Sequence, residues 1–200
     1  MTAGASDDAA ETTGRADQYA CTEAVLDVTP DAAVVSNLGV ASYVLAAVAP
    51  DRARNVYQWG SMGATTAVGL GLARATDDPV TVLEGDGSLL MSLGVLATVA
   101  REGPSNLVVV LWANDVYGTT GGQSLRADHV DFVAAAESCG LDAATARTDA
   151  GFRTAYREAV EREGPGLVVC HVDPVDPDAR PPFDYPYIAR RVRDALTGGD

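Results

Sequence analysis

Residues 83–123 read LEGDGSLLMSLGVLATVAREGPSNLVVVLWANDVYGTTGGQ, and this stretch decides the fold. An apolar segment ends in Gly85-Asp86-Gly87, a helical pattern follows, and a second apolar segment ends just before Asn114. One strand–helix–strand unit separates the two polar side chains, so both reach the same edge of a parallel sheet. A carboxylate and an amide oxygen beside tight glycine turns suit a hard cation that carries a diphosphate.

The rest of the chain continues this alternation of strands and helices. Strands are expected at residues 31–36, 80–83, 107–112, 143–146 and 166–172, and residues 56–58 form a brief apolar stretch before Gly60. Helices are expected up to residue 48, at 61–75 and 88–101, from 129 to 138 after a cap at Asp128, and up to 163 after a cap at Asp149. The order predicts one α/β domain, a doubly wound parallel sheet with helices on both faces.

The two ends of the chain differ from this pattern. Residues 1–18 are small, polar and acidic, and we expect a disordered tail there, with the domain at residues 19–175. Residues 176–200 form a Pro-rich tail that ends in a short helix at 188–196. No signal peptide or apolar run of about 18 residues is present, so we expect a cytoplasmic protein without a membrane span.

Composition restricts the partners. The 28 acidic residues outnumber the 14 basic ones, every basic residue is Arg, and the net charge is −14, which disfavours nucleic acid and anionic membrane. A carboxylate-rich surface without Lys resembles the proteins of halophilic archaea, and the alternative is an ordinary acidic protein from a GC-rich genome. Cys21, Cys139 and Cys170 are too scattered for a disulfide framework or a zinc site.

Four motifs carry a family resemblance. They are SNLGVAS (36–42), YQWGSMGATTAVGLGLA (57–73), EGDGSLLMSLGVLATVA (84–100) and NDVYGTTGGQ (114–123). Together they resemble the diphosphate-binding domain of the thiamine diphosphate (ThDP)-dependent 2-oxoacid decarboxylases. The stretch is especially similar to the sulfopyruvate decarboxylase β subunit and to the matching half of phosphonopyruvate decarboxylase. Ala113 and Ala41 depart from the family pattern, which more often has Asp and Pro there.

The resemblance implies roles for these residues. Asp86, Asn114 and the carbonyl group of Val116 would bind Mg²⁺. The diphosphate would be held by Ser36, Asn37, Ser88, Leu89, Tyr117 and Gly118, and the same turns bring Ser61, Gly85 and Gly87 to the cofactor. The Gly60 carbonyl would accept a hydrogen bond from the 4′-amino group of the aminopyrimidine, and Met62 would be the apolar wedge that bends the cofactor.

Each of these residues also has a purely structural interpretation. Gly85-Asp86-Gly87 is also typical of a strand-to-helix turn with an Asp cap, Asn114-Asp115 of a turn, and Met62 of a core methionine. Gln123 and Arg126 are candidates to face an anionic substrate, although Arg126 is equally compatible with a solvated or interface position. His129 fits a structural or interface role better than that of a base, and His171 receives no role.

One component of a ThDP enzyme is not apparent in the sequence. In the family, a glutamate on a separate pyrimidine-binding domain of about 150 residues contacts the aminopyrimidine. The segment before Ser36 is too short for such a domain, Glu11 and Glu23 lie outside any strand–helix pattern, and Glu84 lies on the wrong side of the cofactor. We therefore expect a partner α subunit that docks on helix 61–75 and the nearby rim, completing a hetero-oligomer.

The resulting hypothesis is a subunit of a ThDP-dependent decarboxylase for a short 2-oxoacid, inactive without its partner. A second hypothesis is the β subunit of a 2-oxoacid:ferredoxin oxidoreductase, although the cysteines have the wrong spacing for an iron–sulfur cluster. A third is a ThDP-binding module without catalysis.

Overall fold

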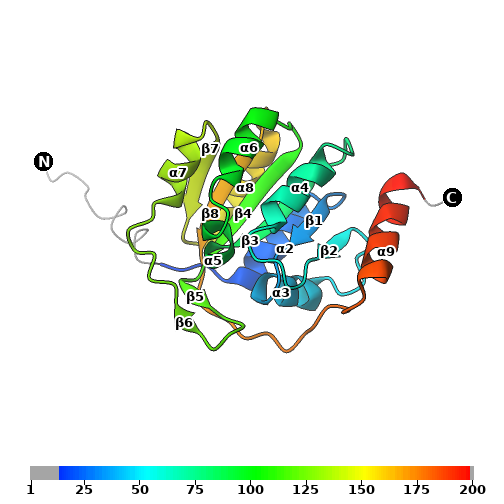
Figure 1. Cartoon of the computed structure of the whole chain (residues 1–200), viewed down its shortest axis with the longest axis horizontal. Coiled ribbons are helices and arrows are strands. Elements are labelled where there is room, and N and C mark those ends of the chain that lie inside the picture. Colours follow the sequence, from blue (N-terminus) through cyan, green and yellow to red (C-terminus); the bar gives the residue numbers. More distant parts are fainter. Residues whose placement is uncertain (1–13, 199–200) are drawn as a thin grey trace, which may run out of the picture.

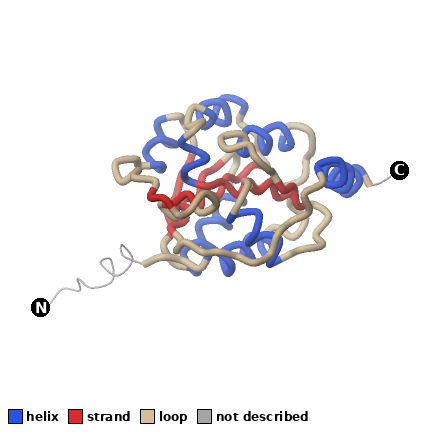
Figure 2. Tube along the Cα trace, turned by 60° about the horizontal axis from the view of Figure 1, so that its bottom comes forward, coloured by secondary structure: helices blue, strands red, loops and turns tan. Residues whose placement is uncertain are grey.

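The centre of the molecule is one parallel sheet. The computed structural model describes residues 14–198, in which six strands pair in the order β2-β1-β3-β4-β8-β7 (Figure 1). The strands are β1 (Ala33–Ser36), β2 (Asn55–Tyr57), β3 (Val80–Gly85), β4 (Leu107–Ala113), β7 (Asp142–Ala146) and β8 (Gly166–His171). Every neighbouring pair in this sheet is parallel, and helices lie on both sides of it (Figure 2). The predicted doubly wound α/β fold is confirmed.

The helices divide between the two faces. One face is covered by α2 (Gln18–Val28), α3 (Val40–Val48) and α8 (Asp149–Glu161). The opposite face is covered by α4 (Thr65–Ala73), α5 (Asp86–Leu90), α6 (Val95–Glu102) and α7 (Phe132–Ser138). The last helix, α9 (Tyr185–Thr197), packs beside β2 at the edge of the sheet.

Strand β4 shows why this sequence needs helices on both sides. All seven of its residues are buried, and they alternate between the two apolar clusters. Val108, Val110 and Trp112 face α2 and α8, whereas the residues between them face α4 and α6. A strand that is apolar on both faces is stable only when both faces are covered, so the unbroken run in the sequence specifies a three-layer structure.

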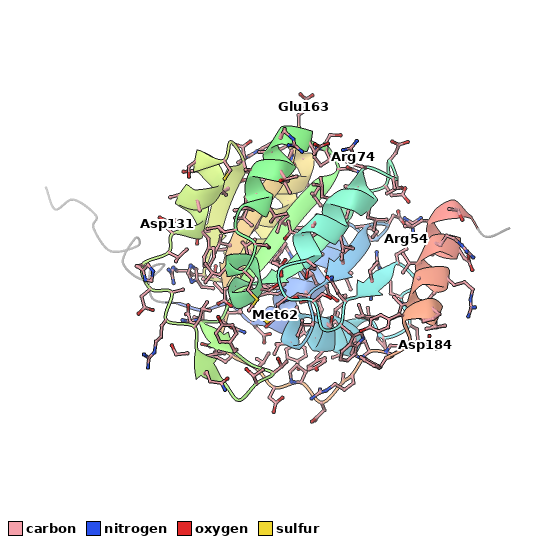
Figure 3. The ribbon with its side chains drawn as sticks, in the orientation of Figure 1. Arg54, Met62, Arg74, Asp131, Glu163 and Asp184 are labelled. Carbon is pink, nitrogen blue, oxygen red and sulfur yellow. The ribbon has the colours of Figure 1, made fainter. Side chains whose placement is uncertain are left out.

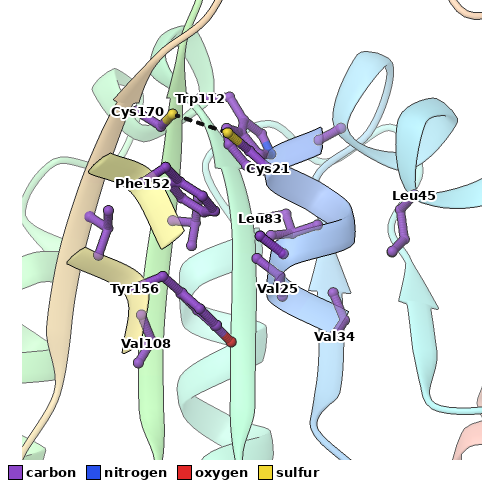
Figure 4. Packing of buried hydrophobic residues seen from close by; sticks show 14 of the residues in the cluster. Cys21, Val25, Val34, Leu45, Leu83, Val108, Trp112, Phe152, Tyr156 and Cys170 are labelled. Carbon is purple, nitrogen blue, oxygen red and sulfur yellow. Dashed lines mark hydrogen bonds between the residues drawn. The ribbon is translucent and has the colours of Figure 1, made fainter. Parts of the chain in front are cut away.

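Aromatic side chains fill the layer under α2 and α8 (Figure 4). The Phe152 ring packs between Trp112, with 5.4 Å between ring centroids, and Tyr156, with 5.9 Å. The Sγ atoms of Cys21 and Cys170 lie 4.0 Å apart in the same layer, so these two cysteines are small core residues rather than metal ligands. Cys139 is only partly buried, and none of the three cysteines forms a disulfide.

Helix α2 was not anticipated by the sequence analysis. The side chain of Asp17 caps it by accepting hydrogen bonds from the backbone N–H groups of Tyr19 and Ala20. Just before it, Ala16 pairs with Val172 beside the sheet. Residues 16–18 therefore pack with the domain, and the predicted disorder of residues 1–13 falls outside the described part of the chain.

Several expected boundaries were wrong. The helix expected at 88–101 is divided into α5 and α6 by a turn over residues 91–94. Helix α7 is capped by Asp131 rather than Asp128, and α8 is capped by Thr148 rather than Asp149. The polar loop after β4 contains a short hairpin of β5 (Val116–Tyr117) and β6 (Gln123–Ser124). Competing Asp and Ser/Thr caps lie within three residues of one another, and only the tertiary structure selects among them.

Among the described residues, no helix is long and apolar enough to span a membrane.

The C-terminal helix α9 is longer than expected and buries Ile188 and Val192 against the domain.

Helix α4 approaches β3 closely, and this generates a prediction. A Cβ atom added at Gly69 would lie 2.1 Å from Cγ2 of the buried Val82, whereas one added at Gly71 would meet nothing within 4 Å. We expect Gly69→Ala to lower the free energy of unfolding by about 1–3 kcal/mol, because the helix must move off the sheet. The matched variant Gly71→Ala should raise it by about 0.5–1 kcal/mol. Denaturant unfolding measures both, and a neutral Gly69→Ala would contradict the close packing.

Candidate functional site

A cleft opens where the carboxyl ends of β1, β3 and β4 meet. From β1 the chain turns toward β2, and from β3 it turns toward β4, so the connections diverge between these neighbouring strands. Such a switch point is where doubly wound sheets bind ligands. The cleft is lined by Gln18, Asn37, Leu38, Val40, Ala41, Met62, Gly85, Asp86, Gly87, Ser88, Trp112, Asn114, Val116, Tyr117, Gly118, Thr119 and Thr120.

Asp86 lies at the base of this cleft. It follows β3 directly, and its residue is only 3% exposed. One carboxylate oxygen accepts a hydrogen bond from the backbone N–H of Gly87 at 2.7 Å, and the other accepts one from Asp115 at 2.8 Å. Burial raises the pKa of Asp86, while these backbone donors oppose the rise. A buried carboxylate with lone pairs still free is a strong ligand for a small cation.

Asn114 reaches the cleft from the neighbouring strand. Gly85 pairs with Trp112 across β3 and β4, so Asp86 and Asn114 leave the sheet side by side. The Asn114 side-chain oxygen accepts a hydrogen bond from the backbone N–H of Val116 at 3.1 Å. Asp115 lies between Asn114 and Val116 and has a φ of 62°. The backbone reverses direction at this residue, where the β5–β6 hairpin starts. The structure thus brings Asp86, Asn114 and Val116 to one cleft.

Asn37 and Ser88 connect the cleft to the loop that carries Met62. The Asn37 side-chain oxygen accepts a hydrogen bond from the Thr65 hydroxyl at 3.1 Å. The hydroxyl oxygen of Ser88 accepts one from the backbone N–H of Gly63 at 2.9 Å. Met62 itself lines the cleft and lies at the same end of the sheet as α5 (Figure 3). The loop between β2 and α4 is therefore tied to the turns that follow β1 and β3.

The other end of this loop is held by the Pro-rich tail. The Trp59 ring lies 4.9 Å from the Phe183 ring, and its indole N–H donates a hydrogen bond to the carbonyl of Pro182 at 3.2 Å. The Tyr43 ring packs against the Trp59 ring, and the guanidinium group of Arg180 lies over the Tyr43 ring. The tail crosses the carboxyl-end rim of the sheet on its way to α9 (Figure 1), so it supports the segment next to Gly60.

Close backbone approaches shape the cleft. A Cβ atom at Gly87 would lie 2.5 Å from the Tyr117 ring, and one at Gly118 would lie 2.9 Å from Val40. These glycines let the hairpin and the turn after β3 meet around an open space instead of filling it. This requirement explains two glycines of the motifs, Gly87 and Gly118.

Four residues proposed to contact the cofactor do not line the cleft. The Ser36 hydroxyl is buried and shares a 2.7 Å hydrogen bond with that of Ser42, and Leu89 is buried in the apolar layer under α6. Gly60 is exposed, with a φ of 68°, and the Ser61 hydroxyl donates to the carbonyl of Trp59. The side chains of Ser36 and Leu89 thus have structural roles, and contacts of these four residues with a cofactor stay predictions.

The three candidate substrate residues also lie outside the cleft. Gln123 is exposed and bonds to Thr120 within the hairpin, and Arg126 is exposed with a φ of 53°. His129 is exposed and lines a second cavity on the far side of β4, together with His171 and Arg147. Burial, followed by the charge of Arg147, lowers the pKa of His171.

Sequence reasoning gave no role to seven residues of the cleft: Leu38, Val40, Ala41, Thr119 and Thr120 within the four motifs, and Gln18 and Trp112 outside them. Gln18 and Trp112 are the two that no motif indicated. Both are at most 2% exposed, and among the described residues neither the Gln18 side-chain oxygen nor the Trp112 indole N–H has a hydrogen-bond partner. A signal for Gln18 was available, since Asp17 is followed by apolar residues at 21, 24, 25 and 28, the spacing of an amphipathic helix. Trp112 gave no separate signal in the sequence, because it lies within the unbroken apolar run of β4.

Comparison with known proteins places this geometry in a family. The family described as thiamine pyrophosphate enzyme, C-terminal TPP binding domain, matches residues 35–170. The chain belongs to this family. Thiamine pyrophosphate is ThDP, so the resemblance drawn from the four motifs is confirmed, and the matched region includes every residue of the cleft except Gln18.

Curated relatives refine the family assignment. The chain is 42% identical over 155 residues to the sulfopyruvate decarboxylase subunit beta of Methanothermobacter thermautotrophicus, covering 78% of this chain and 80% of the relative. It is 41% identical over 170 residues to the phosphonopyruvate decarboxylase of Streptomyces viridochromogenes, covering 84% of this chain but only 43% of that protein. The chain therefore spans less than half of the second relative.

Solved structures agree on the fold. The benzoylformate decarboxylase of Polynucleobacter necessarius has a TM-score of 0.70 at 21% identity, over 88% of this chain and 36% of that one. A protein of Mycobacterium smegmatis described as a putative thiamin diphosphate-dependent enzyme has a TM-score of 0.66 at 23% identity, over 79% of this chain and 32% of that one. At this identity the likeness supports the fold alone.

The unsatisfied side chain of Gln18 generates a prediction. Replacing Gln18 with Met removes a buried polar group that has no described partner and keeps a similar volume, so the free energy of unfolding should rise by about 1 kcal/mol without ligand. The same substitution at the exposed Gln123, whose side chain makes two hydrogen bonds with Thr120, should instead lower it by about 0.5–1.5 kcal/mol. Urea unfolding of the ligand-free chain measures both. Destabilisation by Gln18→Met would show that this side chain is bonded within the chain.

Proposed function

We propose that the chain is the diphosphate-binding subunit of a ThDP-dependent decarboxylase acting on a short 2-oxoacid like sulfopyruvate or phosphonopyruvate. The single observation that carries the proposal is the convergence of Asp86 and Asn114 on one cleft at the switch point of the sheet. The names of the relatives support the reaction class, since sulfopyruvate and phosphonopyruvate decarboxylases both match at about 40% identity.

The donor set fits a magnesium diphosphate. Asp86 offers a carboxylate, Asn114 an amide oxygen and Val116 a carbonyl oxygen, and hard oxygen donors are what Mg²⁺ prefers. Among the described residues, no group of three or more His, Cys, Asp or Glu side chains is arranged to hold a metal alone. This agrees with a metal that completes its shell with phosphate oxygens and water rather than with further protein ligands.

The residues of this chain would bind, orient and exclude water. Ser88, Tyr117 and Gly118 stand beside Asp86, where the diphosphate would lie, and Met62 offers an apolar contact toward the rings. Gly60 has its carbonyl in the loop beside Met62, where the aminopyrimidine amino group would find an acceptor. When bound, ThDP supplies the electron sink for loss of CO₂. Holding the cofactor in a bent form is the contribution we assign to Met62.

A partner subunit is part of the proposal. No glutamate is among the residues that line the cleft, and the nearest in sequence to Asp86, Glu84, is fully buried below it. The relatives named subunit beta are consistent with an assembly in which a second, pyrimidine-binding subunit supplies the activating glutamate.

The alternative of a ferredoxin oxidoreductase subunit is not favoured. Two of the three cysteines face each other in the apolar core, where they have no room for an iron–sulfur cluster. The non-catalytic module differs from our proposal only in the absence of turnover with a partner.

Replacing Asp86 with Ala tests the metal site. We expect at least about a 100-fold loss of magnesium-dependent ThDP affinity, because even an outer-shell partner of a metal contributes about 10- to 100-fold. Calorimetric titration of ThDP with MgCl₂, on the chain alone and with its partner, gives the affinity. The matched control is Asp51→Ala, which removes an exposed carboxylate that makes no side-chain hydrogen bond in the described part of the chain. Retained affinity in Asp86→Ala would refute the assigned site, and full decarboxylation of an oxoacid by the chain alone would refute the need for a partner.

We also infer that the chain is adapted to high salt, from its charge of −14 and its lack of Lys. Its described ion pairs are mostly exposed, so each contributes at most about 1 kcal/mol, and repulsion between carboxylates dominates. The Debye length falls from about 10 Å at 0.1 M to about 3 Å at 1 M salt, which screens this repulsion. The unfolding temperature should therefore rise with KCl up to molar concentrations. A fall over that range, with sucrose at equal osmolality as the control, would contradict the inference.

A further inference from the structure

Glu84 is a buried carboxylate to which the proposed mechanism gives no role. It lies near the end of β3, two residues before Asp86, and it is 0% exposed. Its hydrogen-bond partners are neutral groups. Burying a carboxylate in this way is costly unless every oxygen is hydrogen-bonded. The positions of its hydrogen-bond partners therefore show which elements Glu84 connects.

The partners of Glu84 lie on α4 and on the turn after β3. One carboxylate oxygen accepts hydrogen bonds from the backbone N–H of Thr66 at 3.1 Å and from the Thr66 hydroxyl at 2.9 Å. The other accepts one from the backbone N–H of Gly85 at 3.2 Å. Burial raises the pKa of Glu84, and hydrogen bonds from Ser88 and Thr66 oppose the rise.

Through Thr66, Glu84 caps helix α4. The residue at the N-cap position, Ala64, has no side chain able to accept a hydrogen bond, so the first N–H groups of the helix depend on partners from elsewhere. The carboxylate of Glu84 reaches across from the sheet and accepts one of them, and a negative charge at this end is favoured by the helix dipole. The cap of α4 is thus supplied by the strand that leads to Asp86.

Residues at and just before the start of α4 make hydrogen bonds to the turns around the cleft. Gly63 donates its backbone N–H to Ser88, Thr65 donates its hydroxyl to Asn37, and Thr66 donates to Glu84. Met62 directly precedes this set. Its position relative to Asp86 is therefore determined by three hydrogen-bonded connections, and Glu84 supplies the one that fixes the helix itself.

We propose that Glu84 is a positioning residue that sets the Met62 loop relative to the diphosphate site, by capping α4 from the end of β3. The inference rests on the proposed function, because Met62 and Gly60 are assigned there to the ring end of ThDP. Glu84 also accepts hydrogen bonds from Gly85 and Ser88 at the diphosphate end, and its connection to the Met62 loop runs through Thr66 and the start of α4.

The chemistry of the site requires a carboxylate. Each oxygen of Glu84 accepts from a backbone N–H, and a backbone N–H cannot reverse its direction. A glutamine would place its NH₂ group against one of these N–H groups in either orientation of the amide. Glu84→Gln keeps the shape of the side chain but opposes an N–H of Thr66 or of Gly85, whereas Thr66→Val removes one hydrogen bond of the connection to α4 and leaves the Gly85 bond in place.

The test compares two ligands on the full chain in complex with its pyrimidine-binding partner. Inorganic diphosphate with Mg²⁺ fills only the metal end of the site, whereas ThDP with Mg²⁺ also needs the Met62 loop. We expect Glu84→Gln and Thr66→Val to weaken ThDP binding about 10-fold and to leave diphosphate binding within about 2-fold. Calorimetry gives both affinities without any measurement of turnover.

Thr81→Val is the matched control. Thr81 lies at the other end of β3, it is also buried, and its hydroxyl shares a 2.6 Å hydrogen bond with that of Tyr156. This variant should change neither affinity. The inference would be overturned if Glu84→Gln and Thr66→Val lost affinity equally for both ligands, or lost affinity for neither. If Glu84→Gln does not fold, the ratio of the ThDP and diphosphate affinities of Thr66→Val decides instead. This variant keeps both the Glu84 carboxylate and the Thr66 backbone N–H.

The two proposals fail in different ways. A wild-type complex that binds neither ligand with Mg²⁺ would overturn the proposed function and this inference with it. A wild-type complex that binds both, combined with variants that keep the ratio of the two affinities, overturns the role of Glu84 alone.

Discussion

The hydrogen bond from the backbone N–H of Asp115 to the carboxylate of Asp86 is the interaction on which the cleft depends. It joins the turn after β3 to the turn after β4, and so holds the two sides of the site at a set separation. It forms only because Gly85 and Trp112 are paired across the parallel strands, which brings both turns to the same edge. The buried carboxylate is stabilised by backbone donors, yet it keeps free lone pairs toward the cleft, where a cation would lie.

Around this bond the molecule combines a rigid frame with unsatisfied groups. The frame is the sheet, covered on both faces and closely approached by α4 at Gly69. The unsatisfied groups are the side-chain oxygen of Gln18 and the indole N–H of Trp112, which lack partners within the described residues and line the cleft. Departures from local rules of stability are expected at functional sites, where a ligand restores the missing interactions. Glu84 belongs to the frame, because its own interactions are complete.

The same domain occurs in two contexts among the relatives. It accounts for 80% of a sulfopyruvate decarboxylase subunit beta and for 43% of a phosphonopyruvate decarboxylase. At the rim, the exposed side chains of Phe183 and Tyr185 contact Trp59, which directly precedes the loop of Gly60 and Met62. Under the proposed function, the pyrimidine-binding partner would meet this rim.

By itself the sequence determined the layered fold and the location of the site. The unbroken apolar run of β4 required cover on both faces, and the spacing of Asp86 and Asn114 required one strand–helix–strand unit between them. Only the tertiary structure decided which neighbours complete the site. Gln18 enters the cleft because α2 packs on the sheet, and Glu84 caps α4 through Thr66, which lies 18 positions before it in the chain. Such contacts depend on how separate elements pack in space, which no local pattern of residues encodes.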